Sequence, residues 1–113
     1  MRTDIQYQYD PPHALLCLSG ELDLATRTGL RDAFGAVRIR GCTRVDVDAE
    51  GVTFIDASCL GVLAREQRRW VGDGGELTVI AGSRYYRLVA GLAGHDELLP
   101  DQRGAASPYA AVL

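Results

Sequence analysis

A strand-like segment, a short acidic loop and a helical segment follow one another over residues 44–71, and this order constrains the fold more than any other feature of the chain. Apolar and polar residues alternate over 44–48, which is typical of a half-buried strand. From residue 60 onward, apolar residues recur at helical spacing. Asp56 stands between the two segments at the position of a helix N-cap. The sequence therefore predicts that Ser58 lies in the first turn of a helix over 58–71.

The same two patterns recur along the chain and predict a mixed α/β sheet. Residues 5–9 alternate and 14–18 are almost entirely apolar, which predicts a hairpin of two strands across the prolines between them. Two further strands are predicted over 43–48 and 76–81, each separated from the strand before it by a helix-length segment. Strands joined through helices run parallel, so we expect a four- to five-stranded mixed sheet with helices packed mainly on one face.

Helix boundaries are marked by capping residues. Asp23 stands at or just before the cap of a first helix that ends near Gly41, and Ser83 is the expected cap of a last helix through Ala90. The first helix carries its apolar residues at i, i+3, i+4 and i+7, namely Leu30, Ala33, Phe34 and Val37. We expect one domain over residues 1–100 and a loose tail over 101–113.

Composition restricts the classes of function. The chain has 113 residues, enough for one domain with an ordinary core, and a net charge of -3 that argues against a nucleic-acid or anionic-membrane surface. No apolar run approaches the roughly 20 residues of a membrane span and the start lacks an apolar signal core, so we expect a cytoplasmic protein. Its three cysteines are scattered and its two histidines lie in loops, which gives no expectation of a metal site, a cofactor or a catalytic triad.

Several motifs resemble the STAS family of bacterial anti-sigma-factor antagonists. The sequence FIDASCLGVL at residues 54–63 is similar to the family's signature. Further similar elements are LSGELDL at 18–24, VDVD at 45–48 with VTF at 52–54, and weaker matches at 77–82 and 92–99. Together these elements cover residues 14 to about 100 in the family's order and spacing. The resemblance implies a STAS-like domain that acts as a binding protein rather than an enzyme.

The resemblance also implies a mechanism and a partner. Ser58 matches the hydroxyl residue that the family's kinase phosphorylates, and Asp23 and Asp56 match acids near that residue. The unphosphorylated protein would bind an anti-sigma factor that is also a serine kinase and so release a sigma factor. Phosphorylation of Ser58 would end this interaction, and a phosphoserine phosphatase would restore it. Asp48 matches a family acid at the end of the third strand, where we expect it to orient the loop.

A helical wheel of residues 58–71 predicts two faces. Leu60, Leu63, Ala64, Gln67, Trp70 and Val71 form the face expected to pack on the sheet. The opposite strip is expected to face solvent, with Gly61 at its edge and with Ser58, Val62, Arg65 and Arg69 along it. On the residues alone, this strip is more typical of an ordinary solvated helix face than of a binding site. With it, the strip and its neighbours Asp23, Asp56 and Cys59 become the expected partner-binding residues.

The sequence leaves open the role of Cys59 and two alternatives to a switch at Ser58. Cys59 stands where the family usually has glycine, and it is either a packed small residue or a thiol activated by the helix N-terminus. The domain is also compatible with a scaffold subunit of a stress-signalling complex that does not switch at Ser58. A module that senses a nucleotide or another small ligand near Asp23 and Asp56 is the remaining alternative.

Overall fold

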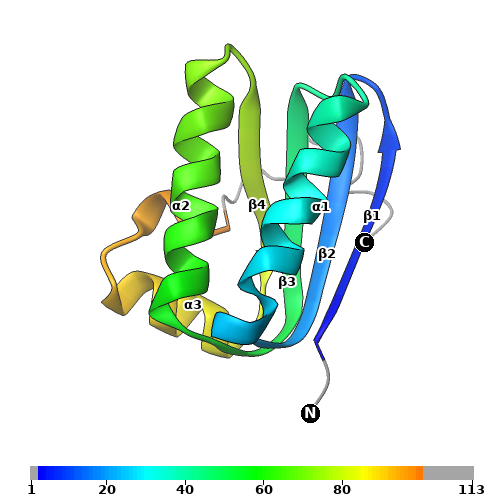
Figure 1. Cartoon of the computed structure of the whole chain (residues 1–113). Helices are drawn as coiled ribbons and strands as arrows, with labels where there is room; N and C mark the ends of the chain where they lie inside the picture. Colours follow the sequence, from blue (N-terminus) through cyan, green and yellow to red (C-terminus); the bar gives the residue numbers. More distant parts are fainter. Residues whose placement is uncertain (1–2, 101–113) are drawn as a thin grey trace.

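A four-stranded sheet forms the centre of the molecule in the computed structural model, which describes residues 3–100 (Figure 1). The strands lie in the order β1-β2-β3-β4; β1 runs antiparallel to β2, and the other neighbours are parallel. The predicted mixed sheet is therefore confirmed. The elements are β1 (Asp4–Asp10), β2 (His13–Leu22), η1 (Leu24–Thr26), α1 (Arg27–Ile39), β3 (Arg44–Ile55), α2 (Ala57–Gly72), β4 (Glu76–Gly82), α3 (Arg84–Leu92) and η2 (Asp96–Leu98). The expected tail over 101–113 lies outside the described residues.

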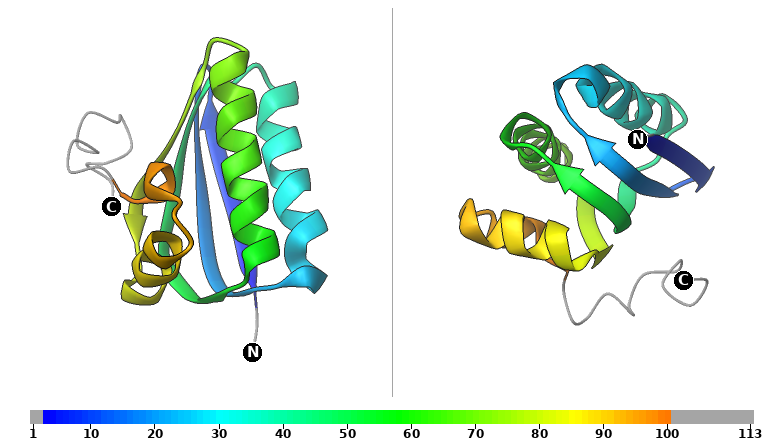
Figure 2. Two further views of the ribbon diagram at one scale, coloured as in Figure 1. Left: turned by 90° about the vertical axis from the view of Figure 1, so that its left-hand side faces the viewer. Right: turned by 90° about the horizontal axis from the view of Figure 1, so that it is seen from below.

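The helices α1 and α2 lie side by side across one face of the sheet (Figure 2). Each of them follows a parallel strand, so both begin at the same end of the molecule and run back along the sheet. The helix α3 packs near β3 and β4 at that same end, and Ser83 caps it by accepting a hydrogen bond from the Tyr86 N–H at 3.0 Å. No helix within residues 3–100 is long and apolar enough to cross a membrane.

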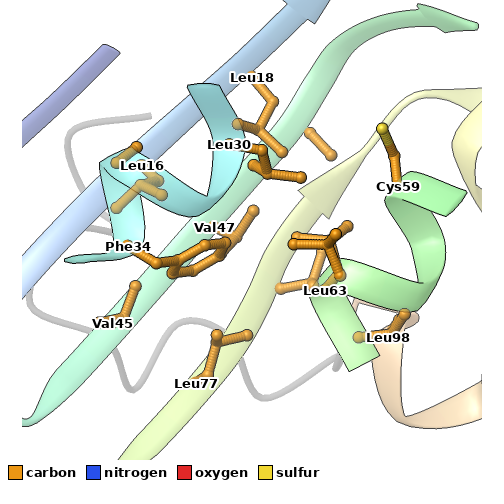
Figure 3. Packing of buried hydrophobic residues seen from close by; sticks show 14 of the residues in the cluster. Leu16, Leu18, Leu30, Phe34, Val45, Val47, Cys59, Leu63, Leu77 and Leu98 are labelled. Carbon is orange, nitrogen blue, oxygen red and sulfur yellow. The ribbon is translucent and has the colours of Figure 1, made fainter. Parts of the chain in front are cut away.

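The hydrophobic core fills the space between the sheet and these helices (Figure 3). The predicted apolar side of α1 is confirmed, because Leu30, Ala33, Phe34 and Val37 are all buried. They pack in one cluster with strand residues that include Val45 and Val47 and with Leu63 of α2. This packing fixes how α1 and α2 sit on the sheet, and therefore where their first turns lie.

The strand β3 is longer than the pattern over 43–48 predicts, because an irregularity interrupts the alternation without ending the strand. The register of β3 shifts against β4 after Val47, and Asp48 accepts a hydrogen bond from the Glu50 N–H at 2.9 Å. Asp48 thus lies inside the strand and not at its end, which corrects our expectation, although it does orient the neighbouring backbone. A Cβ on Gly51 would lie 2.7 Å from the Ser19 Cβ, so only glycine allows β3 to continue beside β2.

The helical wheel predicts the sheet-facing side of α2 correctly except at Val71. It is wrong about Val62, which it places on the side that faces solvent. Leu60, Leu63, Ala64 and Trp70 are buried, whereas Val71 is 58% exposed. Val71 lies about 100° around the helix from Trp70, so the burial of Trp70 turns Val71 toward solvent. Val62 is only 2% exposed, because α1 covers that side of α2. A helical wheel considers packing against the sheet only, so it does not predict burial by a neighbouring helix.

We predict that Leu63→Ala lowers the free energy of unfolding by about 2–5 kcal/mol, because it removes fully buried atoms from the shared core. Val71→Ala is the matched control on the same helix, and its exposed side chain should change stability by less than about 0.5 kcal/mol. Urea unfolding followed by circular dichroism measures both. Equal losses in the two variants would contradict the observed orientation of α2.

Candidate functional site: the first turn of α2

The carboxyl ends of β2 and β3 meet at one end of the sheet, and an aspartate follows each strand. Asp23 caps η1 by accepting a hydrogen bond from the Ala25 N–H at 3.0 Å, while its own N–H donates to the Thr26 hydroxyl at 2.9 Å. Asp56 caps α2. The right-hand view of Figure 2 shows this end of the molecule from below, with the beginnings of α1 and α2 and the helix α3 gathered around the strand ends. Both predicted caps are confirmed.

Asp56 connects three parts of the site. Its Oδ1 accepts the Cys59 N–H at 2.9 Å and the Ser58 hydroxyl at 2.7 Å. Its backbone N–H donates to the carbonyl of Leu22 at 3.0 Å, which joins the end of β3 to the end of β2. One residue therefore fixes the start of α2, the direction of the Ser58 hydroxyl and the position of the loop relative to the neighbouring strand.

The charge of Asp56 is stabilised by these hydrogen bonds. Partial burial acts to raise the pKa of the Asp56 carboxyl, but donors at Cys59 and Ser58 outweigh it and hold the pKa below its ordinary value. The carboxylate is therefore ionised at neutral pH. A negative charge at this position also interacts favourably with the positive end of the α2 dipole.

Ser58 is half-buried and lies in the first turn of α2, as the sequence predicts. Because its O–H donates to Asp56, the hydroxyl hydrogen points toward the carboxylate and the oxygen lone pairs point elsewhere. The side chain therefore presents an oriented hydroxyl oxygen at the end of the molecule. Such an oxygen is suited to accept a phosphoryl group from a docked donor.

Cys59 lies on the core side of α2 and not on the partner-facing surface that we expected. Its side chain is 0% exposed, and Figure 3 shows it on the same side of the helix as Leu63. The thiol donates to the backbone carbonyl of Asp23 at 3.2 Å, so it links α2 to the loop after β2. Burial raises the pKa of the Cys59 thiol and the Asp56 charge raises it further, which contradicts an activated thiol. Cys59 is a packed small residue.

The remaining strip residues of α2 have different surroundings. Arg65 and Arg69 are exposed, as expected, and Gly61 is half-buried with open space where a Cβ would stand. Val62 lies at the floor of a groove between α1 and α2. The helical wheel predicts one continuous strip that faces solvent. In the structure, Ser58 lies at the start of the helix, whereas Val62, Arg65 and Arg69 belong to one side of the groove.

Exposed apolar side chains at the same end of the molecule were not among the predicted site residues. Leu24 directly follows Asp23 and is exposed. Phe54, two residues before Asp56, is exposed and stacks on Tyr85 of α3 with ring centroids 5.9 Å apart. Phe54 stands within the motif at 54–63, but only the fold shows that Tyr85 joins it. These side chains give the site an apolar rim.

Among the described residues, no three His, Cys, Asp or Glu side chains gather as a possible ligand set. The site consists of a capped helix start, an oriented hydroxyl and an apolar rim.

The fold and this helix start define a class of small α/β domains, and comparison of the sequence with family models identifies the class. Residues 5–100 match the model described as Mlab, STAS domain. The chain therefore belongs to the STAS domain family. No curated protein matches the sequence.

Solved structures with the same fold include several anti-sigma factor antagonists. One from Mycobacterium paratuberculosis has 24% sequence identity and a TM-score of 0.77, covering 93% of this chain and 92% of its own. Unphosphorylated SpoIIAA has 18% identity and a TM-score of 0.76, covering 97% and 98%. A putative antagonist from Thermotoga maritima has 17% identity and a TM-score of 0.75, covering 90% of each chain. The fold of residues 3–100 is thus that of these proteins.

We predict that Asp56→Ala lowers the free energy of unfolding at pH 7 by about 0.5–2 kcal/mol, the usual cost of losing an N-cap. The carboxyl has a lower pKa in the folded than in the unfolded state, so its contribution is present above the unfolded pKa of about 3.9. It is lost as the pH falls through the folded pKa, and the difference between wild type and variant should shrink in acid. Urea unfolding from pH 7 to pH 2.5 measures this trend.

Asp56→Asn is the matched control for this prediction. Asparagine keeps a side-chain oxygen that caps α2 but does not ionise. Its unfolding free energy should stay close to that of the wild type at pH 7, with less pH dependence in the acid range. A difference between Asp56→Ala and wild type that grows as the pH falls would contradict the assigned role of the carboxylate.

Proposed function

We propose that this protein is an anti-sigma-factor antagonist that is switched at Ser58. The unphosphorylated protein binds a serine-kinase anti-sigma factor, which then releases its sigma factor. The Ser58 oxygen forms a bond to the terminal phosphorus of the kinase's ATP as the bond to ADP breaks. ADP leaves, the hydroxyl proton passes to solvent, and the interaction ends. A phosphoserine phosphatase returns the protein to its binding state. The chain itself acts as a binder and a substrate.

One observation carries this proposal: Ser58 presents an oriented, partly exposed hydroxyl in the first turn of α2, in a domain of the STAS family. The neighbouring structures support it, since they include SpoIIAA in an unphosphorylated and a phosphorylated form, with TM-scores of 0.76 and 0.68. SpoIIAA thus has this fold in both forms.

Phosphorylation should change the domain itself only slightly. The phosphate would add about -1.5 to -2 charges at neutral pH and would replace the hydrogen bond to Asp56 with repulsion between anions. The helix N-terminus favours an anion by about 0.3–1 kcal/mol, which opposes that repulsion. Because the Asp56 carboxylate also holds the Cys59 N–H, the helix cap persists.

A docked partner would respond much more strongly than the domain. The exposed apolar side chains of Leu24, Phe54 and Tyr85 at this end of the molecule are suited to contact a protein surface, and a docked partner would exclude water from the interface. A phosphate desolvated there against apolar or acidic atoms costs several kcal/mol, on the order of 3 or more. With roughly 1.4 kcal/mol per tenfold in affinity, this cost releases a modest complex.

We predict that incubation with the candidate kinase and ATP adds one phosphate to the wild type and none to Ser58→Ala, as measured by intact mass. Thr53→Ala is a control, because it removes another hydroxyl close in sequence while leaving Ser58 in place. A phosphate that persists in Ser58→Ala would overturn the assignment of Ser58.

The switch itself is tested by the affinity of Ser58→Asp for the same kinase. We predict a loss of at least tenfold relative to the wild type, while Ser58→Ala keeps its affinity within a few-fold. Equal affinity of Ser58→Asp and wild type would instead favour a scaffold subunit that does not switch. Isothermal titration calorimetry measures all three proteins.

A further inference from the structure

A groove of about 530 Å³ runs between α1 and α2 and begins one helical turn beyond Ser58. Arg31, Gly35, Arg38 and Ile39 line it from α1, and Val62, Arg65, Glu66 and Arg69 line it from α2. The two helices lie side by side in both views of the molecule (Figure 2). The groove therefore continues from the helix start that carries the candidate site.

The groove is strongly cationic, although the whole chain has a net charge of -3. Its lining holds four arginines and one glutamate. The glutamate, Glu66, is buried and pairs with Arg38 at 2.7 Å. Within residues 3–100, Arg31, Arg65 and Arg69 form no ion pair. Three guanidinium groups are thus available to a ligand.

The shape of the groove leaves room for a ligand between these charges. A Cβ placed on Gly35 would meet no atom within 4 Å, so open space lies above α1 at this point. Val62 lies buried beneath the groove, and Ile39 of α1 is the exposed apolar side chain at its edge. An occupant would therefore contact the Ile39 side chain and the guanidinium groups along the sides.

We propose that this groove binds an acidic amphipathic helix of a partner protein. Guanidinium groups match carboxylates in geometry and charge, and the exposed Ile39 side chain is suited to contact the hydrophobic side of such a helix. This inference rests on the proposed function for the identity of the partner, an anti-sigma factor. The acidic character of the bound helix is inferred from the charge of the groove and not from the hydroxyl of Ser58.

The position of Ser58 connects this groove to the switch. Ser58 precedes Val62 by one turn, about 6 Å along the helix axis. A phosphate of about -1.5 to -2 charges at that distance lies within the Debye length of about 8 Å at physiological salt. Phosphorylation would therefore repel an acidic helix in the groove, in addition to any desolvation cost at Ser58 itself.

The test is a titration of the ¹⁵N-labelled protein with a synthetic amphipathic helix of glutamate and leucine, followed by heteronuclear NMR. A matched peptide with glutamine in place of every glutamate is the control. We expect saturable shifts of the amides of groove residues such as Gly35 and Glu66 with the acidic peptide, weakening as salt is raised, and at least tenfold weaker binding of the glutamine peptide.

Two pairs of variants test the location of binding. Gly35→Glu places an anion in the open space, and Gly35→Ala adds only a methyl group there. Arg65→Glu reverses a groove charge, whereas Arg44→Glu reverses an exposed charge that pairs with Glu76 on the sheet. We expect Gly35→Glu and Arg65→Glu to weaken binding roughly tenfold or more, and their controls to stay within about threefold.

Several outcomes would overturn the inference. These are equal binding of the two peptides, shifts centred away from α1 and α2, no saturable shift at millimolar peptide, or tighter binding of a DNA duplex at the same amides. The proposed function is judged separately by phosphate transfer to Ser58. Phosphorylation of Ser58 without binding of the acidic peptide would support the proposed function and contradict this inference. Binding of the peptide without phosphorylation of Ser58 would support the inference and contradict the proposed function.

Discussion

The cap that Asp56 provides at the start of α2 is the interaction on which the rest of this site depends. The carboxylate accepts hydrogen bonds from the Cys59 N–H and from the hydroxyl of Ser58, and the backbone N–H of the same residue donates to the end of β2. The position of the Ser58 hydroxyl is therefore fixed relative to the sheet, through Asp56 and its bond to β2. Under the proposed function, a phosphate on Ser58 would therefore stand at a defined place on the surface.

The separation between folding and signalling follows from the same geometry. The core beneath α2 is formed by residues such as Leu60 and Leu63, which lie on the other side of the helix from the exposed arginines. Charges added at the helix start change the surface potential and leave this packing intact. Under the proposed function, this separation would allow Ser58 to be phosphorylated and dephosphorylated without disrupting the core.

The sequence was sufficient for the features that local chemistry determines. Asp23, Asp56 and Ser83 were predicted as caps, because an acid or hydroxyl before an apolar helical pattern has few other roles. Val62 and Cys59 were placed on the wrong side, because their burial depends on α1 and on the loop after β2, which a helical wheel does not contain.

The full length of β3 was missed for a similar reason. Its alternation is broken by the irregularity after Val47, and the role of Gly51 depends on how closely Ser19 approaches from another strand. The Phe54–Tyr85 contact joins residues of two separate elements, and no local pattern contains it. Local sequence thus predicted where elements begin, while contacts between elements decided which of their residues are accessible.

The ion pair between Arg38 and Glu66 has a consequence for recognition. One partner belongs to α1 and the other to α2, and the Arg38 guanidinium also lies 4.8 Å from the centre of the Trp70 ring. The ion pair and the Arg38–Trp70 contact join the two helices on the side away from the sheet, in addition to the core between them. The width of the groove between α1 and α2 is therefore set by contacts within the domain itself, so a ligand of the groove would have to fit a spacing that already exists.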